Sequence, residues 1–473
     1  MYISEFINNE LAFISVDKDD KNIVFKFSNE SKEIKNLFNF LDENKDEKII
    51  TLNKSRILYG LIQNRAAIEK LMFIEFNEYQ SLVSIWRNKK DGIINENHIP
   101  ISNIVGEQLN LKTLMLNQDI KKMDTNTENT ITKLIYEQYK SEIELRGIIA
   151  QKYKIPAYTT KYELIQGIFE KRVKKGEERE KDFKLSEVLI DKKYPKLLEP
   201  IIKKIENISV TNDDITDLIN DSVMIKSTEV KIGMGGLHGH LKGFFDSDMD
   251  NVILSIDVSS YYPSIIVNNN LVPNNLEGFL DEYKKLYNKK MEEDSRYKHI
   301  INYVYGLSNN KNSMFYDPKF ATTITLNGQL MMLKLLNTIQ ANVDTFVPLV
   351  VNTDGFYCIV SRNESKKLLD ITDNWCKVYN LKTTTEYLRK LIIQNGNNLI
   401  KIGEVDEYEN KISVKGKSLA SFEGKGIFNT NLLGNNPLKQ KVMKENIIIL
   451  LTLYLLELKP IDETMDKLLE ITR

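Results

Sequence analysis

Residues that form covalent or metal crosslinks are scarce in this chain of 473 residues. There are two cysteines, Cys358 and Cys376, and four histidines. Two cysteines cannot build a disulfide framework, so we expect a reducing compartment. His238 and His240 lie two residues apart with no cysteine nearby, a pattern that does not predict a zinc site.

The sequence also lacks a long apolar run and a leader. The run Ile447–Leu456 is about half of the roughly 20 residues that a membrane helix needs. The opening MYISEFINNEL carries polar and acidic residues where a signal peptide is basic and then apolar. We therefore expect a cytoplasmic protein (host cytoplasm, if a phage encodes it) with no membrane partner.

Neither sign of charge is in excess. The chain has 65 basic and 66 acidic residues, a net charge of −1. A protein that coats DNA is usually basic overall, so the balance argues against that class. It does not exclude a nucleic-acid enzyme, because only the surface of its cleft must be positive.

The length suffices for about three domains. Residues 1–125 alternate short apolar runs with polar turns, which predicts a small α/β domain, and the polar segment Lys121–Thr130 is a candidate linker. Residues 126–222 are helical in pattern and highly charged. Their run KRVKKGEEREK is either a solvated surface or an arm that binds nucleic acid. No internal repeat is visible.

The part from residue 223 onward has a different pattern. Val252–Ile256 predicts a buried strand, and the apolar runs Phe346–Val351 and Phe356–Val360 around Asn-Thr-Asp-Gly predict a hairpin. Lys284–Tyr305 and Phe320–Ile339 have helical spacing, although Asn327-Gly328 counts against the second helix. The tail from Leu438 is helical in pattern.

Two aspartates stand where such elements end. Asp257 follows the buried strand, and Asp354 lies at the hairpin tip. Phosphoryl transfer by two metal ions needs carboxylate oxygens that hold a pair of Mg²⁺ ions about 3.5–4 Å apart, and two strand ends of one sheet can supply them. The backbone carbonyl of Val258 could add a ligand. Taken singly, each aspartate is more often a turn or cap residue.

The residues around these aspartates resemble the motifs of family-B DNA polymerases. Asp257 begins DVSSYYPSII, which is similar to DxxSLYPSII. Lys298 begins KHIINYVYG, which is similar to KxxxNSxYG, and Asn352-Thr-Asp-Gly355 resembles DTDS with its second aspartate kept. Gly233-Met-Gly-Gly236 resembles the Gly-Gly loop before the palm of that family. All four occur in the family's order.

The resemblance implies a role for each matching residue. Tyr262 would lie under the incoming sugar and exclude a 2′-hydroxyl, although it could instead be a core aromatic. Lys298 and Asn302 would bind the nucleotide, with Lys290 either joining them or remaining a solvated helix residue. Contacts with DNA are implied for Tyr305, Gly306, Gly235, Gly236, Lys415 and Lys417. Lys415-Gly416-Lys417 is equally well explained as a basic turn.

Several positions depart from the family pattern. Asn352 replaces the first aspartate of DTDS and Gly355 its serine. In the N-terminal region, where the family has a 3′–5′ exonuclease, Ile3 stands at the place of the first aspartate and only Glu5 remains. The next strand offers Asn53 and no aspartate. We therefore expect this domain to be a degenerate exonuclease.

The expected fold is α+β, with the right-hand architecture of a polymerase and an N-terminal exonuclease-like α/β domain. It comprises an antiparallel palm sheet, short helical fingers and a small helical thumb. The expected segments are 1–125 (exonuclease-like), 126–222 (charged helical linker), 223–270 and 316–425 (palm), 271–315 (fingers) and 426–473 (thumb).

The expected function is template-directed DNA polymerisation without proofreading, with two Mg²⁺ ions (or Mn²⁺ in their place) as cofactors. The expected partners are primer–template DNA, dNTPs, and phage or plasmid replication proteins. One alternative is an inactive polymerase-like protein that binds DNA or replication partners. Another is a primer-making or terminal-transfer enzyme on the same palm. A reverse transcriptase is disfavoured because no Tyr-x-Asp-Asp occurs at the hairpin.

Overall fold

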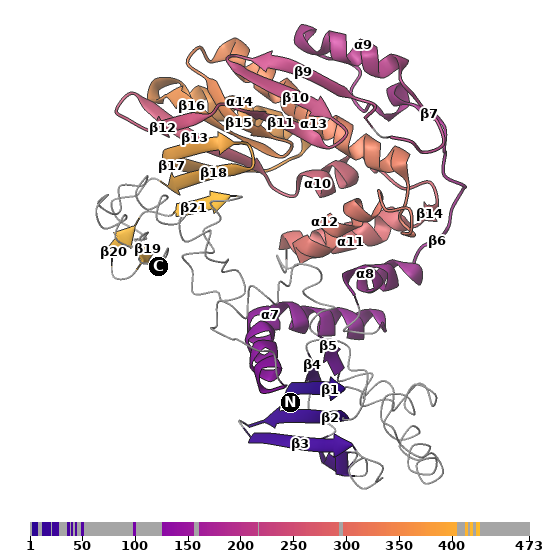
Figure 1. Ribbon diagram of the computed structural model, residues 1–473. Coiled ribbons are helices and arrows are strands. Elements are labelled where there is room, and N and C mark those ends of the chain that lie inside the picture. Colours follow the sequence, from indigo (N-terminus) through magenta and orange to yellow (C-terminus); the bar gives the residue numbers. More distant parts are fainter. Residues whose placement is uncertain are drawn as a thin grey trace. The chain divides into compact units, whose positions relative to one another are not determined.

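The computed structural model contains two compact units, which divide at residue 168 (Figure 1). It describes residues 2–7, 12–19, 21–27, 36–37, 39–40, 43–44, 49–51, 98–100, 125–155, 160–215, 217–292, 297–403, 412–414, 417–419 and 422–425. Residues 52–97, residues 404–411 and the whole tail from residue 426, which includes the expected thumb, lie outside the described residues.

The first unit is built on a mixed sheet with strand order β3-β2-β1-β4-β5. β1 pairs antiparallel with β2 and parallel with β4. The strands are β1 (Tyr2–Ile7), β2 (Ala12–Lys18), β3 (Lys21–Phe27), β4 (Ile49–Thr51) and β5 (His98–Pro100). This agrees with the α/β class expected for the region.

Helix α7 (Thr125–Tyr153) packs on this sheet and buries Ile135, Ile143 and Ile149. It begins inside the segment whose polar composition suggested a linker. The side chain of Asn129 in this segment is buried rather than solvated, and its Nδ2 donates a hydrogen bond to the Ser15 carbonyl at 3.5 Å. The helix therefore belongs to the first unit.

The region between residues 161 and 210 is helical only in part. The helices are α8 (Lys161–Glu170), α9 (Glu199–Asn207) and the short 3₁₀ turns η2 (Leu185–Val188) and η3 (Lys196–Leu198). Two-residue strands lie between and beside them: β6 (Lys174–Lys175), β7 (Phe183–Lys184) and β8 (Ser209–Val210). The charged run KRVKKGEEREK is thus not one helix. Its Lys174 and Lys175 pair with β14 (Leu276–Glu277).

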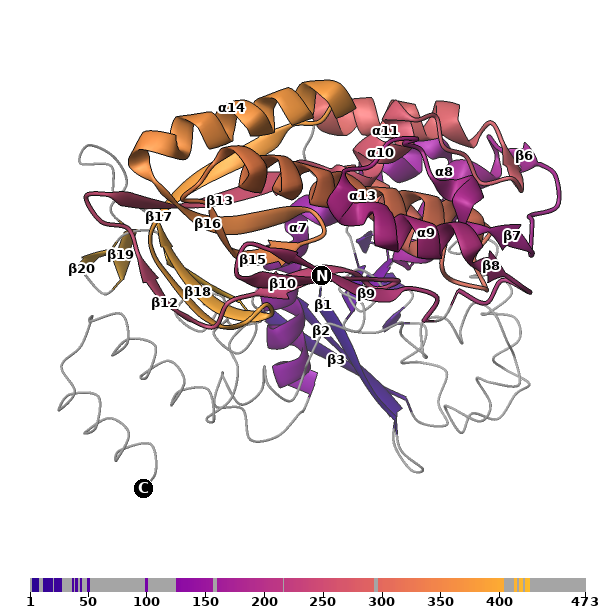
Figure 2. The same cartoon turned by 90° about the horizontal axis from the view of Figure 1, so that it is seen from above.

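The second unit contains a curled antiparallel sheet with strand order β21-β18-β17-β13-β16-β15-β11-β10-β9, and β12 pairs with β17 (Figures 1 and 2). The strands are β9 (Asn220–Ile225), β10 (Thr228–Gly233), β11 (Gly236–His240), β12 (Gly243–Asp246), β13 (Asn251–Val258), β15 (Val347–Asn352), β16 (Gly355–Ser361), β17 (Thr383–Asn395), β18 (Asn398–Gly403) and β21 (Phe422–Lys425). A separate pair consists of β19 (Ile412–Val414) and β20 (Lys417–Leu419).

Helices cover one face of the central strands, as the view from above shows (Figure 2). The covering helices are α13 (Pro318–Asn342) and α14 (Arg362–Tyr379). Helix α10 (Tyr261–Asn268) packs on α13, and α11 (Phe279–Glu292) and α12 (Lys298–Leu307) pack on α10 and on each other. Because the curled sheet encloses the other face, Val252–Ile256 of β13 are buried on both sides, as their continuous apolar run predicted.

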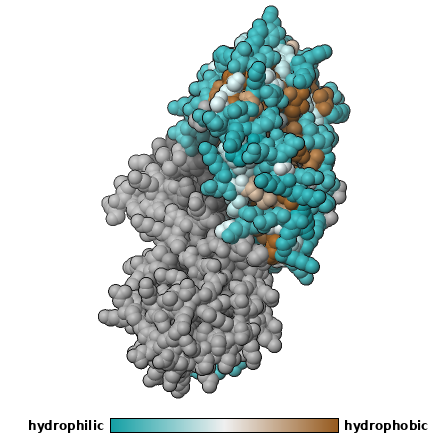
Figure 3. All heavy atoms as spheres, turned by 90° about the vertical axis from the view of Figure 1, so that its right-hand side faces the viewer, coloured by the Kyte–Doolittle hydropathy of each residue, from teal (hydrophilic) through white to brown (hydrophobic). Residues whose placement is uncertain are grey.

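Helix α13 forms the core of this unit despite its internal Asn327-Gly328. Asp317 caps it by accepting a hydrogen bond from the Phe320 N–H at 3.0 Å, and Pro318 follows in the first turn. Among the described residues, no helix is long and apolar enough to span a membrane. The face in Figure 3 is mostly hydrophilic over its described part, with apolar side chains in small separate groups.

Candidate active site

The two aspartates singled out in the sequence lie on adjacent strands of the curled sheet. Asp257 is near the end of β13, and Asp354 is in the two-residue loop between β15 and β16. The Asp354 carbonyl accepts a hydrogen bond from the Val258 N–H at 2.7 Å, and Asp257 is the register partner of Gly355. The pairing fixes the hairpin tip beside the end of β13, so residues almost 100 positions apart share one site.

Gly355 gives the Asp257 carboxylate its room. A β-carbon at this position would lie 2.4 Å from Asp257 Oδ1 and 2.6 Å from the Ile256 carbonyl oxygen. Both contacts are far below the normal packing distance. Glycine at position 355 therefore leaves the space that the Asp257 carboxylate occupies.

The electrostatic surroundings of Asp257 favour a cation. Partial burial and then the negative charge of Asp354 raise the pKa of Asp257 above its ordinary value. Lys401 opposes this shift. Its ammonium forms a 2.8 Å ion pair with Glu386, which lies on β17 as the register partner of Ser255. The effect of Asp354 on Asp257 shows that the two carboxylates are close enough to repel one another.

A hollow of about 480 Å³ lies at this end of the sheet and collects residues from three of the four sequence motifs. Predicted site residues that line it are Val258, Tyr262, Lys298, Asn302, Tyr305 and Asp354. The remaining lining residues are His238, Ser260, Tyr261, Pro263, Asn352, Thr353, Asn397 and Lys425. Asp257 stands next to Val258 but does not itself line the hollow, and neither do Lys290, Gly306, Gly235 and Gly236.

An aromatic pair forms one wall of this hollow. The rings of Tyr262 and Tyr305 have centroids 4.5 Å apart at an angle of 46°. Burial raises the pKa of Tyr262, and it raises the pKa of Tyr305 to about 12. Both phenols therefore stay neutral at ordinary pH. Tyr262 is half-buried, with its ring at the hollow, whereas the neighbouring Tyr261 is buried and donates to the Gly328 carbonyl at 2.7 Å.

Lysines gather on the side formed by α11 and α12. Burial lowers the pKa of Lys290, and the charges of Lys298 and Lys382 lower it further. Lys298 itself is exposed at the hollow, and Lys425 reaches the hollow from β21. Cations that are close enough to repel one another suit a ligand with several negative charges.

The Gly-Gly loop supports the hairpin tip. Gly235 and Gly236 belong to the turn between β10 and β11, and Gly236 has φ +126°, which only glycine adopts readily. A β-carbon on Gly236 would lie 2.6 Å from Thr353 Oγ1, and that oxygen accepts the Leu237 N–H at 2.9 Å. The contacts described for this loop are therefore with other parts of the protein, and the DNA contact predicted for Gly235 and Gly236 stays a prediction.

Among the residues of the hollow that the sequence did not predict, two lie far from every motif. Asn397 lies in the β17–β18 turn and Lys425 in β21, and no local pattern connects either with the aspartates. The Asn-Gly of that turn signals a hairpin but not its location. Lys415 lies outside the described residues. Lys417 is on β20, and its side chain is likewise outside them.

The two carboxylates fit a hard divalent cation. Mg²⁺ prefers carboxylate oxygen and keeps much of its water shell, so a pair of aspartates is a sufficient protein contribution. In the described part of the chain, no group of three or more histidine, cysteine, aspartate or glutamate residues is placed to hold a metal. The remaining ligands would be water, backbone or substrate oxygens.

Comparison with solved structures gives distant likenesses, of which a DNA polymerase is an example. No family model and no curated protein matches the sequence. The structure is similar to the family B DNA polymerase from the hyperthermophilic archaeon Pyrobaculum calidifontis, with a TM-score of 0.43 and 11% sequence identity. The match covers 99% of this chain and 64% of that one. This chain therefore spans somewhat less than two thirds of the polymerase.

Proposed function

We propose that the protein is a template-directed DNA polymerase that joins a primer 3′-hydroxyl to the α-phosphate of a dNTP and releases pyrophosphate. The observation that carries the proposal is the convergence in space of motifs that are separated in sequence. Tyr262, Lys298, Asn302, Tyr305 and Asp354 line one hollow. They are also the residues whose order resembles the motifs of family-B polymerases.

Each group in the hollow or beside it has a task that its chemistry suits; Asp257 and Lys290 lie beside it, next to Val258 and near Lys298. Asp257 and Asp354 would hold the Mg²⁺ ions, which neutralise the charge that develops on the phosphates. Lys298, Lys290 and Lys425 present positive charge to the triphosphate. The Tyr262 ring, held against Tyr305, offers a flat surface for the deoxyribose and leaves little room for a 2′-hydroxyl.

Primer extension with the purified full-length protein, Mg²⁺, dNTPs and an annealed primer–template tests the proposal. Asp257→Asn or Asp354→Asn should slow extension by three decades or more, about 4 kcal/mol of barrier, and should leave DNA binding nearly unchanged. Asp370→Asn is the matched control, because Asp370 is an exposed carboxylate on α14. A rate above about a tenth of wild type in either site variant would contradict the metal assignment.

The same assay separates the alternatives. Extension that needs no template indicates terminal transfer, and products formed without a primer indicate a primer-making enzyme. DNA binding without any nucleotide addition indicates a polymerase-like binding protein. Asn352 stands where the DTDS motif has its first aspartate. DNA binding without nucleotide addition would therefore fit a protein that has lost catalysis.

A further inference from the structure

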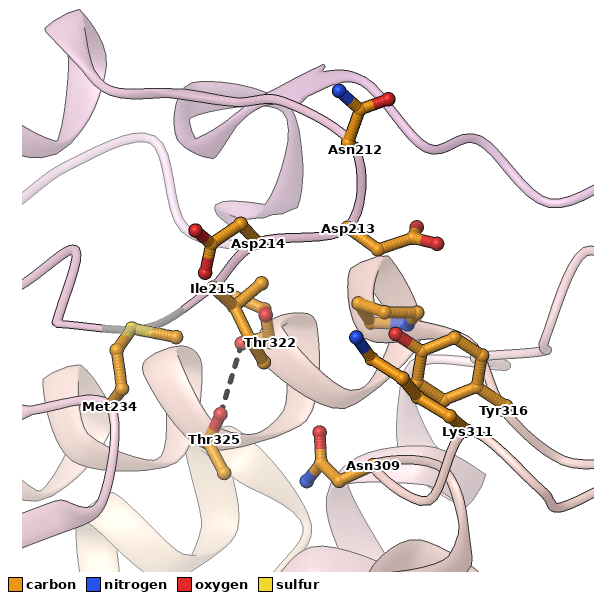
Figure 4. Close-up of a pocket in the computed structure, with 11 residues that line it drawn as sticks. Asn212, Asp213, Asp214, Ile215, Met234, Asn309, Lys311, Tyr316, Thr322 and Thr325 are labelled. Atoms are coloured by element: carbon orange, nitrogen blue, oxygen red, sulfur yellow. Dashed lines mark hydrogen bonds between the residues drawn. The ribbon is translucent and has the colours of Figure 1, made fainter.

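A second hollow, of about 650 Å³, lies in the same unit between the 212–215 segment, α13 and the loop after α12 (Figure 4). Its volume is in the range of small-molecule sites. Its lining residues are Asn212, Asp213, Asp214, Ile215, Met234, Asn309, Lys311, Tyr316, Pro318, Thr322 and Thr325.

This second hollow shares a wall with the candidate active site. Tyr305 lines the first hollow, and its side chain forms hydrogen bonds with Asn309 and Thr325, which line the second. Met234 reaches the second hollow from the turn whose Gly236 packs on Thr353 of the first. A single DNA strand that enters the candidate active site past Tyr305 would therefore pass the second hollow.

Two residues that line this hollow each carry a buried polar atom with no partner among the described residues. The Asp213 side chain is 8% exposed, and its Oδ2 accepts hydrogen bonds from Arg179, whereas Oδ1 has no partner among the described residues. Thr322 is 1% exposed, and its Oγ1 has none there either. Buried polar groups are normally paired, so these two atoms point to a ligand that can donate and accept hydrogen bonds.

The other walls of the second hollow suit a flat, weakly polar ligand. Tyr316 offers an aromatic ring whose position is fixed by the Arg179 guanidinium, 4.8 Å from the ring centroid. Met234, Ile215 and Pro318 supply apolar surface. The carboxylates of Asp213 and Asp214 would repel a phosphate in the interior, while the Lys311 ammonium can contact one that is attached to the ligand.

We infer that this second hollow is a nucleobase pocket for a base with an exocyclic amino group, which would donate to Asp213 Oδ1. The base belongs to an unpaired nucleotide of the strand that approaches Tyr305. That assignment of the strand rests on the proposed polymerase function, whereas the chemistry of the pocket does not. A free nucleotide has the same chemistry and is tested separately.

The test measures binding of fluorescent primer–template DNA to the full-length protein by anisotropy. The template overhang is all cytosine, all thymine or abasic. Cytosine has an amino group where thymine has a carbonyl, so wild-type protein should bind the cytosine overhang about tenfold more tightly than the thymine overhang. Asp213→Asn should remove this preference. Thr322→Val, which keeps the shape, should weaken binding of both base-containing overhangs toward the abasic value.

Asp221→Asn and Thr338→Val are the matched controls, because Asp221 pairs with Lys204 elsewhere and Thr338 lies on the exposed part of α13. Thermal unfolding verifies that all variants fold. Unfolding of Asp213→Asn, which loses the carboxylate that binds Arg179, would leave Thr322→Val as the deciding variant. Competition by dCMP at the affinity of the overhang would support the base pocket and identify a free nucleotide as its ligand.

Equal binding of the cytosine, thymine and abasic overhangs by the wild-type protein would overturn the pocket. So would a cytosine preference that both variants retain. Neither result depends on catalysis. Base-dependent binding without primer extension would refute the polymerase and keep the pocket, whereas extension with base-independent binding would refute the pocket and keep the polymerase.

Discussion

At the scale of single residues, Gly355 stands where the DTDS motif has a serine, and the absence of a side chain there leaves room for the Asp257 carboxylate. Restoring the family's residue with Gly355→Ser places a β-carbon against Asp257 and the Ile256 carbonyl. Overpacking of this kind costs about 1–3 kcal/mol. We expect a lower Tm together with a loss of primer extension of about a hundredfold or more, because Asp257 must move.

The control for Gly355→Ser is Gly235→Ala, since a β-carbon on Gly235 meets nothing within 4 Å. It should leave the Tm unchanged. An unchanged Tm and full activity in Gly355→Ser would show that the strands adjust without displacing Asp257.

The adjacent tyrosines, Tyr261 and Tyr262, allow a matched test of sugar selection. Tyr262→Ala should lower discrimination against ribonucleotides by about tenfold or more, because its ring lines the hollow. Tyr261→Phe removes only the buried hydrogen bond to Gly328 and should cost about 1 kcal/mol of stability without changing the choice of sugar. The measurement is single-nucleotide incorporation of dNTP against NTP. Unchanged discrimination in Tyr262→Ala would assign that ring to the core.

At the scale of elements, Glu364 ties the start of α14 to the turn before β15. Its carboxylate accepts hydrogen bonds from the Asp344 and Thr345 N–H groups and from the Thr345 hydroxyl at 2.6 Å. The bonds from the Thr345 hydroxyl and N–H lower the pKa of Glu364 in the folded protein. A depressed folded pKa means that the stabilisation is present above the unfolded pKa and is lost as the pH falls through the folded one.

Glu364→Gln should therefore lower the Tm at neutral pH, and the difference from wild type should shrink in acid. Thermal unfolding at a series of pH values measures this. Glu199→Gln serves as the control, because Glu199 is an exposed glutamate at the start of α9. A deficit in Glu364→Gln that stays constant down to acid pH would mean that the charge of Glu364 is unimportant.

Elements with a continuous or strictly spaced apolar pattern could be predicted from the sequence. The buried strand at Val252–Ile256, the hairpin around Asn352–Gly355 and the helix over Phe320–Ile339 were predicted and are confirmed, the helix extending from Pro318 to Asn342. The helix tolerates Gly328 because Tyr261, Tyr262 and Ile265 pack 3.3 Å from the place where its β-carbon would be. The burial of Asn129 in the first turns of α7 could not be predicted, because it depends on a tertiary contact with β2.

At the scale of the whole molecule, the first unit raises the question of proofreading. Hydrolysis of a 3′-terminal nucleotide by two metals needs several carboxylates at one site. Strand β1 pairs with β2 and β4, and its only carboxylate is Glu5. We predict no metal-dependent 3′–5′ shortening of single-stranded or mismatched primer with Mg²⁺ or Mn²⁺. Shortening that survives Asp257→Asn but disappears with Glu5→Ala would restore an exonuclease.

The candidate site could be predicted only as far as its motifs extend. Asp257, Asp354, Tyr262 and Lys298 are marked by their neighbours in sequence. Lys425 and Asn397 reach the same hollow only because β17, β18 and β21 follow one another across the curled sheet. Strand order is a property of the whole sheet, and no short stretch of sequence specifies it.

Helix α13 contacts the walls of both hollows. Gly328 lies against Tyr262 of the first hollow, and Thr322 and Thr325 line the second. The Gln329 side-chain amide accepts a hydrogen bond from the Gly233 N–H and donates one to the Gly233 carbonyl. Gly233 precedes the turn that supports Thr353. A rigid-body shift of helix α13 would change the shape of both hollows together. Thermodynamic reciprocity then applies: a ligand that favours one position of α13 from the second hollow changes the affinity of the first by the same factor that the first imposes in return.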